Sequence, residues 1–134
     1  MDHLRLKLFT FCAVLIALPA YSAPLLTCKI TYAGATQTVQ AKPVADPYPV
    51  ASVDIGGRFF FKPVMVGNDK RIEYIKLYTY LDTNTQPVLV HWAKYLPPFS
   101  RSGNPANLTG DQTVYAGPVE RELHYRCTLE GVSQ

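Results

Sequence analysis

Three cysteines are the residues of this chain with the most reactive side chains, and their places in the sequence decide what chemistry they can do. The sequence contains Cys12, Cys28 and Cys127. Cys28 and Cys127 lie in the stretches LLTCKITY and ELHYRCTLE, where apolar and polar residues alternate and each cysteine falls on the apolar side. Such alternation predicts a β-strand with one buried face. Both cysteines are therefore expected to point into a core, from strands near the two ends of the chain.

Residues 1–22 have the pattern of a cleaved secretory signal. Arg5 and Lys7 precede an apolar run over residues 8–20, and the small residues Ala20 and Ser22 lie three and one positions before a cut after Ser22. We expect cleavage at that bond, and a periplasmic or secreted location for the mature protein.

An uncleaved membrane anchor is the alternative interpretation of this segment. Its apolar run of 13 residues contains Pro19, and it is shorter than the roughly 20 residues that span a bilayer. We therefore expect one exported domain over residues 23–134, with no transmembrane segment after signal cleavage.

Signal cleavage would remove Cys12 and leave Cys28 and Cys127 in an oxidising compartment, where a structural disulfide is the simplest pairing. The bond would close a loop of about 100 residues, worth up to roughly 4.7 kcal/mol in the chain-entropy model. Lipidation of Cys28 is disfavoured because Leu26 and Thr27 precede it. A redox pair would be closer in sequence.

The mature chain is expected to be all-β, a single small antiparallel β-sandwich with Greek-key links. Period-2 patterns bounded by Gly, Pro, Asn and Asp recur along it, whereas apolar residues at helical spacing do not. About seven strands in roughly 112 residues favour a sandwich, with a small β-barrel as the alternative. The expected strands are residues 26–32, 36–42, 57–67, 71–81, 88–96, 113–117 and 119–130.

Positions within the sheets follow from composition. The polar segment 36–42 suits an edge strand, while the apolar segments 57–67 and 88–96 suit central strands. Pro63 cannot donate to a ladder, so a bulge or break is expected there. Residues 99–113 show no assignable pattern and predict a long loop of the kind that is often functional or mobile.

Tyr125 two residues before Cys127, with Trp92 between the two cysteines, resembles the immunoglobulin family. In that family the tryptophan follows the first cysteine closely, whereas Trp92 lies 64 residues after Cys28, and only seven residues follow Cys127. The resemblance therefore implies an immunoglobulin-like shape only. The Tyr-x-Cys motif beside a short tail is also similar to small periplasmic lysozyme-inhibitor barrels, but their Ser-Gly-rich inhibitory loop has no counterpart here.

Charge argues against nucleic acid as a partner. Without Asp2, Arg5 and Lys7, the 13 basic and 10 acidic residues of the full chain fall to 11 and 9, with the signs mixed along the sequence. A phosphate backbone requires a concentrated basic surface, and no basic run is present.

Catalytic, metal-binding and cofactor-binding residues are not predicted. His91 and His124 stand alone on their strands without a partner at metal-ligand spacing, although these two strands could pair. No G-x-S-x-G elbow is present, and nothing selects a catalytic pair among the acidic residues.

The most suggestive group of side chains is one face of the strand 71–81. Tyrosine combines an apolar body with a polar tip, so such a face can stack on sugar rings or anchor a protein partner. The alternative is that these rings form part of the core, with the lysine reaching out along them. The face consists of Tyr74, Lys76, Tyr78 and Tyr80, with Trp92 or Tyr95 able to join across the sheet.

The function expected from these observations is that of a non-enzymatic binding or accessory module. It would recognise an envelope protein or glycan through the tyrosine-bearing strand face and the 99–113 loop. One alternative is a small envelope enzyme such as a hydrolase. Another is a structural subunit that shares strands through the polar edge at residues 36–42.

Overall fold

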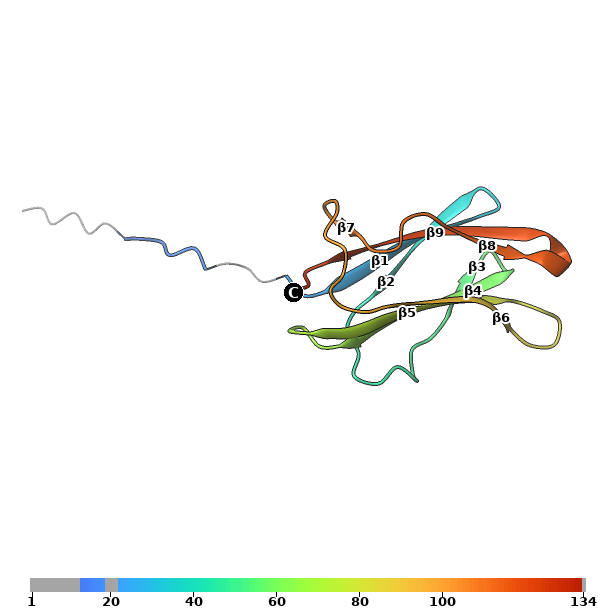
Figure 1. The fold of residues 1–134 in the computed structure, drawn as a ribbon, viewed down its shortest axis with the longest axis horizontal. Coiled ribbons are helices and arrows are strands. Elements are labelled where there is room, and N and C mark those ends of the chain that lie inside the picture. Colours follow the sequence, from blue (N-terminus) through green and yellow to red (C-terminus); the bar gives the residue numbers. More distant parts are fainter. Residues whose placement is uncertain (1–12, 19–21, 134) are drawn as a thin grey trace, which may run out of the picture.

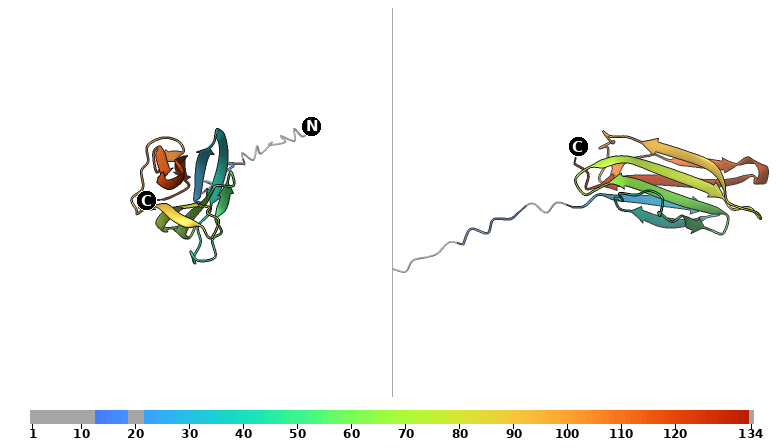
Figure 2. Two further views of the ribbon diagram at one scale, coloured as in Figure 1. Left: turned by 90° about the vertical axis from the view of Figure 1, so that its right-hand side faces the viewer. Right: turned by 90° about the horizontal axis from the view of Figure 1, so that it is seen from below.

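The computed structural model describes residues 13–18 and 22–133, and the second range folds as a sandwich of two antiparallel β-sheets. Figure 1 shows the two sheets one above the other, and Figure 2 shows the same layers from one end and from below. The predicted all-β sandwich is confirmed, and the alternative of a closed barrel is not. Most of the predicted signal, including Cys12, lies outside the described residues. Within them, no helix is long and apolar enough to cross a membrane.

Sheet A combines a hairpin from each end of the chain. The first and last strands, β1 and β9, pair with each other, and each also pairs with the other strand of its own hairpin. A very short strand, β7, extends the pairing of β9. The strands are β1 (Leu25–Tyr32), β2 (Ala35–Ala41), β7 (Ala106–Asn107), β8 (Gln112–Ala116) and β9 (Arg121–Glu130), with a 3-10 turn (Gly117–Val119) between β8 and β9.

Sheet B is formed by the middle of the chain as a four-stranded meander in the order β3-β4-β5-β6. Each strand therefore pairs with the one that follows it in sequence. The strands are β3 (Val53–Ile55), β4 (Phe59–Gly67), β5 (Ile72–Leu81) and β6 (Val88–Tyr95).

All seven predicted strands are present, and the prediction missed two short ones. Strand β3 has three residues and β7 has two, which is too short for an alternating pattern to be recognised. Strand β7 lies in the segment 99–113 that the sequence predicts as a loop, and β3 lies in a segment for which the sequence predicts no strand.

The core lies between the sheets and is made by alternate residues of the long strands. On β5, for example, Ile75 and Leu77 are fully buried, and on β9 so is Leu123. Aromatic rings join the sheets, because Phe61 of sheet B and Tyr125 of sheet A lie with their ring centroids 5.2 Å apart. The largest fully buried side chains include Phe59, Phe61, Leu26, Ile30, Ile55, Met65, Ile75, Leu77 and Leu123.

The β1–β2 hairpin closes through a two-residue turn and the β3–β4 hairpin through a three-residue connection that ends at Arg58, and each has positive φ at two successive positions. At Ala33-Gly34, between β1 and β2, φ is 50° and 81°, and at Gly56-Gly57, between β3 and β4, φ is 62° and 69°. These values match the primed turns, whose twist suits antiparallel strands. Ala33 is thus held in a left-handed conformation that disfavours a residue with a Cβ atom.

The expected break at Pro63 is wrong. Strand β4 continues through Pro63, which is in register with Leu77 of β5, and the register shift occurs later, between Val66 and Gly67. On the side of β4 away from β5, Val44 N donates a hydrogen bond to Met65 O, and Gly67 N donates one to Val44 O. Pro63 is two positions before Met65, so its backbone groups face the same side of β4. Strand β3 pairs only as far as Phe61, so no neighbouring strand needs an N–H from residue 63. No ladder hydrogen bond is lost there.

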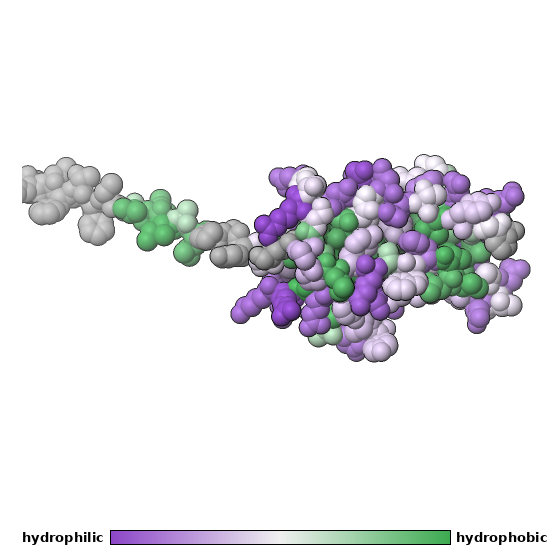
Figure 3. Space-filling model, in the orientation of Figure 1, coloured by the Kyte–Doolittle hydropathy of each residue, from purple (hydrophilic) through white to green (hydrophobic). Residues whose placement is uncertain are grey.

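The prediction that residues 88–96 form a central strand is also wrong. Strand β6 pairs with β5 alone and forms an edge of sheet B, with Val88, Leu89 and Trp92 exposed. Figure 3 shows apolar surface (green) on this side of the sandwich, where β6 and β8 form the edges. The prediction of an edge strand at residues 36–42 is confirmed by β2, and that of a central strand at residues 57–67 is confirmed by β4.

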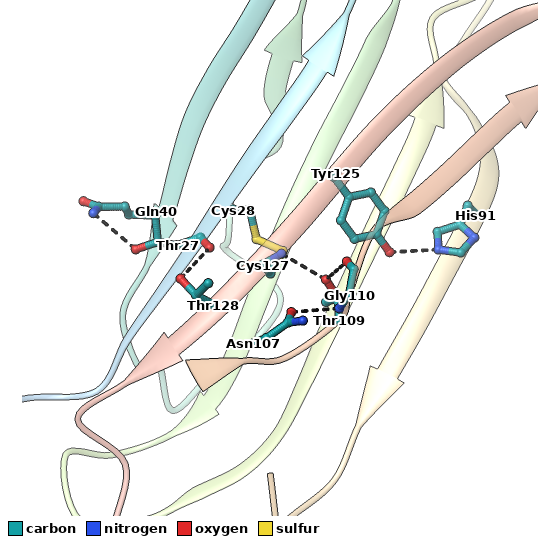
Figure 4. Close-up of a disulfide and its surroundings, with 10 residues drawn as sticks. All are labelled: Thr27, Cys28, Gln40, His91, Asn107, Thr109, Gly110, Tyr125, Cys127 and Thr128. Carbon is teal, nitrogen blue, oxygen red and sulfur yellow. Dashed lines mark hydrogen bonds between the residues drawn. A yellow bond between two sulfur atoms is a disulfide. The ribbon is translucent and has the colours of Figure 1, made fainter. Parts of the chain in front are cut away.

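The predicted disulfide joins Cys28 and Cys127, which are separated by 99 positions in the chain and lie directly opposite each other on β1 and β9. The bond therefore lies within sheet A (Figure 4). The corresponding bridge of antibody domains joins the two sheets, so the resemblance to that family does not extend to the disulfide.

Candidate functional site: an aromatic and basic sheet face

Strand β5 turns its tyrosines outward. Its other face, formed by Ile75, Leu77, Thr79 and Leu81, is buried against sheet A. Tyr74, Lys76, Tyr78 and Tyr80 are half-buried on the outer surface of sheet B. The alternative in which these rings form the core is therefore not the arrangement observed.

Neighbouring strands add to this surface through the register of the sheet. Tyr78 lies opposite Lys62 of β4 and Trp92 of β6, and Lys76 lies opposite Lys94 of β6. Trp92 is 55% exposed. We call this surface the tyrosine face, and it comprises Lys62, Tyr74, Lys76, Tyr78, Tyr80, Trp92 and Lys94.

The rings and ammonium groups of the tyrosine face contact one another. The rings of Tyr78 and Tyr80 stack, with centroids 6.3 Å apart and planes at 22°. Lys76 Nζ and Lys94 Nζ lie 5.5 Å and 5.3 Å from the centroid of the Tyr74 ring. Such cation–π contacts hold the two ammonium groups close to one aromatic ring.

A cleft forms where the loop between β2 and β3 crosses this face. The loop projects beyond sheet B (Figure 1), and Figure 2, right, looks onto the face that it crosses. Asp46 Oδ1 accepts a hydrogen bond from Tyr48 N at 3.0 Å, which shapes the loop tip. Together the loop and the sheet enclose about 260 Å³. The lining residues are Pro47, Tyr48, Lys62, Val64, Tyr74, Lys76 and Tyr78.

The sequence analysis selected five residues of the tyrosine face and missed Lys62 and Lys94. It also missed Tyr48 of the loop that crosses the face. Lys94 follows Trp92 by two positions, so alternation alone assigns it to the same strand face. The position of Lys62 beside Tyr78 depends on strand register, and that of Tyr48 on the path of a loop. Tyr95, proposed as an alternative to Trp92, lies opposite the buried Ile75 and does not join the face.

The two histidines are far from a shared site. His91 lies on β6 in sheet B and His124 on β9 in sheet A, so the two strands do not pair as suggested. Residues 13–18 and 22–133 contain no group of three or more His, Cys, Asp or Glu arranged to hold a metal ion.

His91 instead makes a polar contact across the core. Its Nε2 lies 3.0 Å from the hydroxyl of the buried Tyr125, and either group can donate depending on the histidine tautomer (Figure 4). Desolvation lowers the pKa of His91 below its ordinary value. Burial, and to a lesser extent the charge of Tyr95, raises the pKa of Tyr125. Burial also raises the pKa of Tyr95. All three shifts favour neutral groups inside the sandwich.

The loop over residues 99–113 is anchored to sheet A. Leu108 N donates a hydrogen bond to Cys127 O at 3.0 Å, and Cys127 N donates to Thr109 Oγ1 at 2.9 Å. Asn107 Oδ1 accepts from Gly110 N at 2.9 Å (Figure 4). This bonded part of the loop lies against β9, whereas the tyrosine face lies on the outside of sheet B, so the structure does not bring the two together.

The outer face of sheet A is polar and contains its own ion pair. Arg126 Nε donates to Asp111 Oδ1 at 2.7 Å. This hydrogen bond and the charge of Arg126 lower the pKa of Asp111, and Asp111 in turn raises the pKa of Arg126. Lys29 of β1 lies opposite Arg126. The outer face of sheet A thus has a basic side chain paired with a carboxylate, and the lysines on the outer face of sheet B can be compared with it.

No protein-family model, curated protein or solved structure matches the chain.

Proposed function

We propose that this chain is a non-enzymatic binding module that recognises an envelope partner through the tyrosine face. The observation that carries this proposal is the outward position of three half-buried tyrosines, the exposed Trp92 and three lysines on one hydrogen-bonded sheet surface. Aromatic residues are enriched where proteins bind their partners, because they combine a large apolar area with a polar tip.

We infer that the binding module works outside the cytoplasm. The signal-like pattern of residues 1–22 supports export, and the Cys28–Cys127 disulfide is typical of oxidising compartments such as the periplasm. The mature protein should begin at Ala23, and N-terminal sequencing of the protein from its own cells tests this.

Affinity capture from the envelope fraction of those cells tests the binding role. Tyr78→Ala removes a central ring of the tyrosine face and should weaken capture by a factor of about 30 or more, as expected for a binding hot spot. Tyr115→Ala is the matched control because Tyr115 is 56% exposed on the outside of sheet A. It should leave capture unchanged.

Melting temperatures of both variants separate binding from folding. If Tyr78→Ala captures its partner as well as the wild type while losing stability, Tyr78 has a structural role and the proposal is wrong. Tyr78→Phe, which retains the ring, should capture nearly as well as the wild type.

A further inference from the structure

The cleft on the tyrosine face carries positive charge without a paired carboxylate. Lys62 and Lys76 line the cleft, and Lys94 lies beside Lys76 on the next strand. Among the described residues, Arg126 pairs with Asp111, and His124 contacts Glu122 in a pair that is ionic only when the histidine is protonated; both contacts lie on sheet A. The lysines of the tyrosine face are thus available to an anion from outside.

Acidic residues on the flanking elements are not in ion pairs with these lysines. Asp46 accepts a hydrogen bond from the backbone of Tyr48, and Asp54 accepts one from Gly57 N at 2.8 Å. Both carboxylates therefore shape turns. Glu73, beside Tyr74 on β5, is exposed and is not in an ion pair with these lysines.

Two of the lysines are held close to each other. Lys76 and Lys94 are directly opposite in the β5–β6 register, and both ammonium groups lie near the Tyr74 ring. Like charges directly opposite each other on a sheet destabilise it, and the electron-rich ring face offsets only part of that cost. A bound anion would relieve the repulsion.

The shape of the cleft restricts the kind of ligand. Its volume of about 260 Å³ lies below the usual range for drug-sized ligands, which begins at about 300 Å³, so it suits one ring-sized unit.

Beneath the cleft, the backbone of β4 and β5 is already paired in the sheet. A peptide therefore cannot add as a strand there. Recognition must use the aromatic rings and the ammonium groups.

We propose, building on the binding function above, that the tyrosine face binds an acidic glycan whose sugar units carry carboxylates. One sugar ring would lie in the cleft against Tyr74 and Tyr78, with its carboxylate between Lys62 and Lys76. The polymer would continue past Lys94 and Trp92. The three lysines come from three neighbouring strands, which matches carboxylates repeated along a polymer. A single phosphate dianion is matched better by a bidentate arginine.

Trp92, the single tryptophan of the chain, provides an internal reporter because it lies opposite Tyr78. Titrating the mature protein with polygalacturonate at low ionic strength should change the Trp92 emission and saturate. Lys62→Gln and Lys76→Gln should each weaken binding about tenfold. Lys29→Gln removes the same charge from the exposed outer face of sheet A and should leave the affinity unchanged. Raising the salt to about 0.5 M should weaken binding.

Three results would overturn this inference. The first is the absence of polygalacturonate binding. The second is equal binding of neutral dextran with no effect of the lysine variants, which would leave the binding function standing but remove the acidic ligand. The third is tighter binding of polyglutamate than of polygalacturonate, which would make the occupant an acidic peptide. A failure of the binding function itself shows separately, as unchanged partner capture by Tyr78→Ala.

Discussion

At the scale of single residues, Thr79 is an exception in the core. It is fully buried on the inner face of β5, and its Oγ1 has no hydrogen-bond partner among the described residues. A buried hydroxyl without a partner costs free energy, because it has lost its hydrogen bonds to water.

Thr79→Val replaces this hydroxyl with a methyl group of similar size and should raise the free energy of unfolding by about 1 kcal/mol. Urea denaturation measures the change. Thr38→Val on the exposed face of β2 is the control and should stay within about 0.5 kcal/mol of the wild type. A loss of stability in Thr79→Val would show that the hydroxyl has a partner in solution.

His91 predicts a pH dependence of stability. Its pKa is lowered by desolvation below the ordinary value of 6.5, so the unfolded chain binds the proton more readily than the folded one. The stability that the neutral form of His91 contributes to the folded state is therefore fully present above pH 6.5, and it is lost as the pH falls towards the lowered pKa. His91→Gln can still bond to Tyr125, and its melting temperature should fall less than that of the wild type between about pH 7.5 and pH 5. Equal decreases would contradict the assignment.

Residue alternation predicted which side chains share a face of β5, but not which face is inside. Leu77 and Tyr78 both belong to apolar rows, and tyrosine is common in cores as well as on surfaces. Only the packing of β5 against sheet A shows that Leu77 faces inward. The same packing places Lys62 of β4 and Lys94 of β6 on the outer face beside the tyrosines.

At the scale of elements, the β1–β2 hairpin contains a mismatch between residue and turn. Ala33 adopts φ of 50° at the first central position, followed by Gly34. Asparagine accepts the left-handed conformation more readily, and Asn-Gly is the preferred pair for such turns.

Ala33→Asn should therefore stabilise the protein by about 0.5–1 kcal/mol, which thermal or urea unfolding can measure. Gly34→Ala, at the next turn position with φ of 81°, is the opposite change and should destabilise the protein. If Ala33→Asn destabilises it as well, the turn does not have this geometry in solution.

The order of the strands was less predictable than their existence. The segment that forms β6 is as apolar as a central strand, yet β6 is an edge because the chain leaves sheet B after Tyr95 and crosses to sheet A. Pro63 indicated a break, yet it lies where no neighbouring strand needs its N–H. Both errors arise because pairing partners are set by long-range topology, which local composition does not encode.

At the scale of the whole molecule, the disulfide joins the first and last strands of the domain. Cys28 and Cys127 lie opposite each other, within a ladder that pairs β1 with β9 from Leu25 to Thr31. The bond connects two distant parts of the chain, so its main effect is expected in the unfolded state. The strand patterns at both ends and the count of cysteines were enough to predict it.

The double variant Cys28→Ala/Cys127→Ala should lose about 3–5 kcal/mol of unfolding free energy. Guanidinium denaturation measures this, and chemical reduction of the wild type should give a similar loss. A double variant within about 1 kcal/mol of the wild type would show that the β1–β9 ladder holds the ends together without the bond.

The central claim is that the outer face of sheet B is the binding surface. The most direct measurement is to map backbone amide chemical shifts of the labelled mature protein as its captured partner is added. We predict that the perturbed residues cluster on β4, β5 and β6 around Tyr78, together with the loop tip at Tyr48. Perturbations confined to sheet A or to the 99–113 loop would contradict this account.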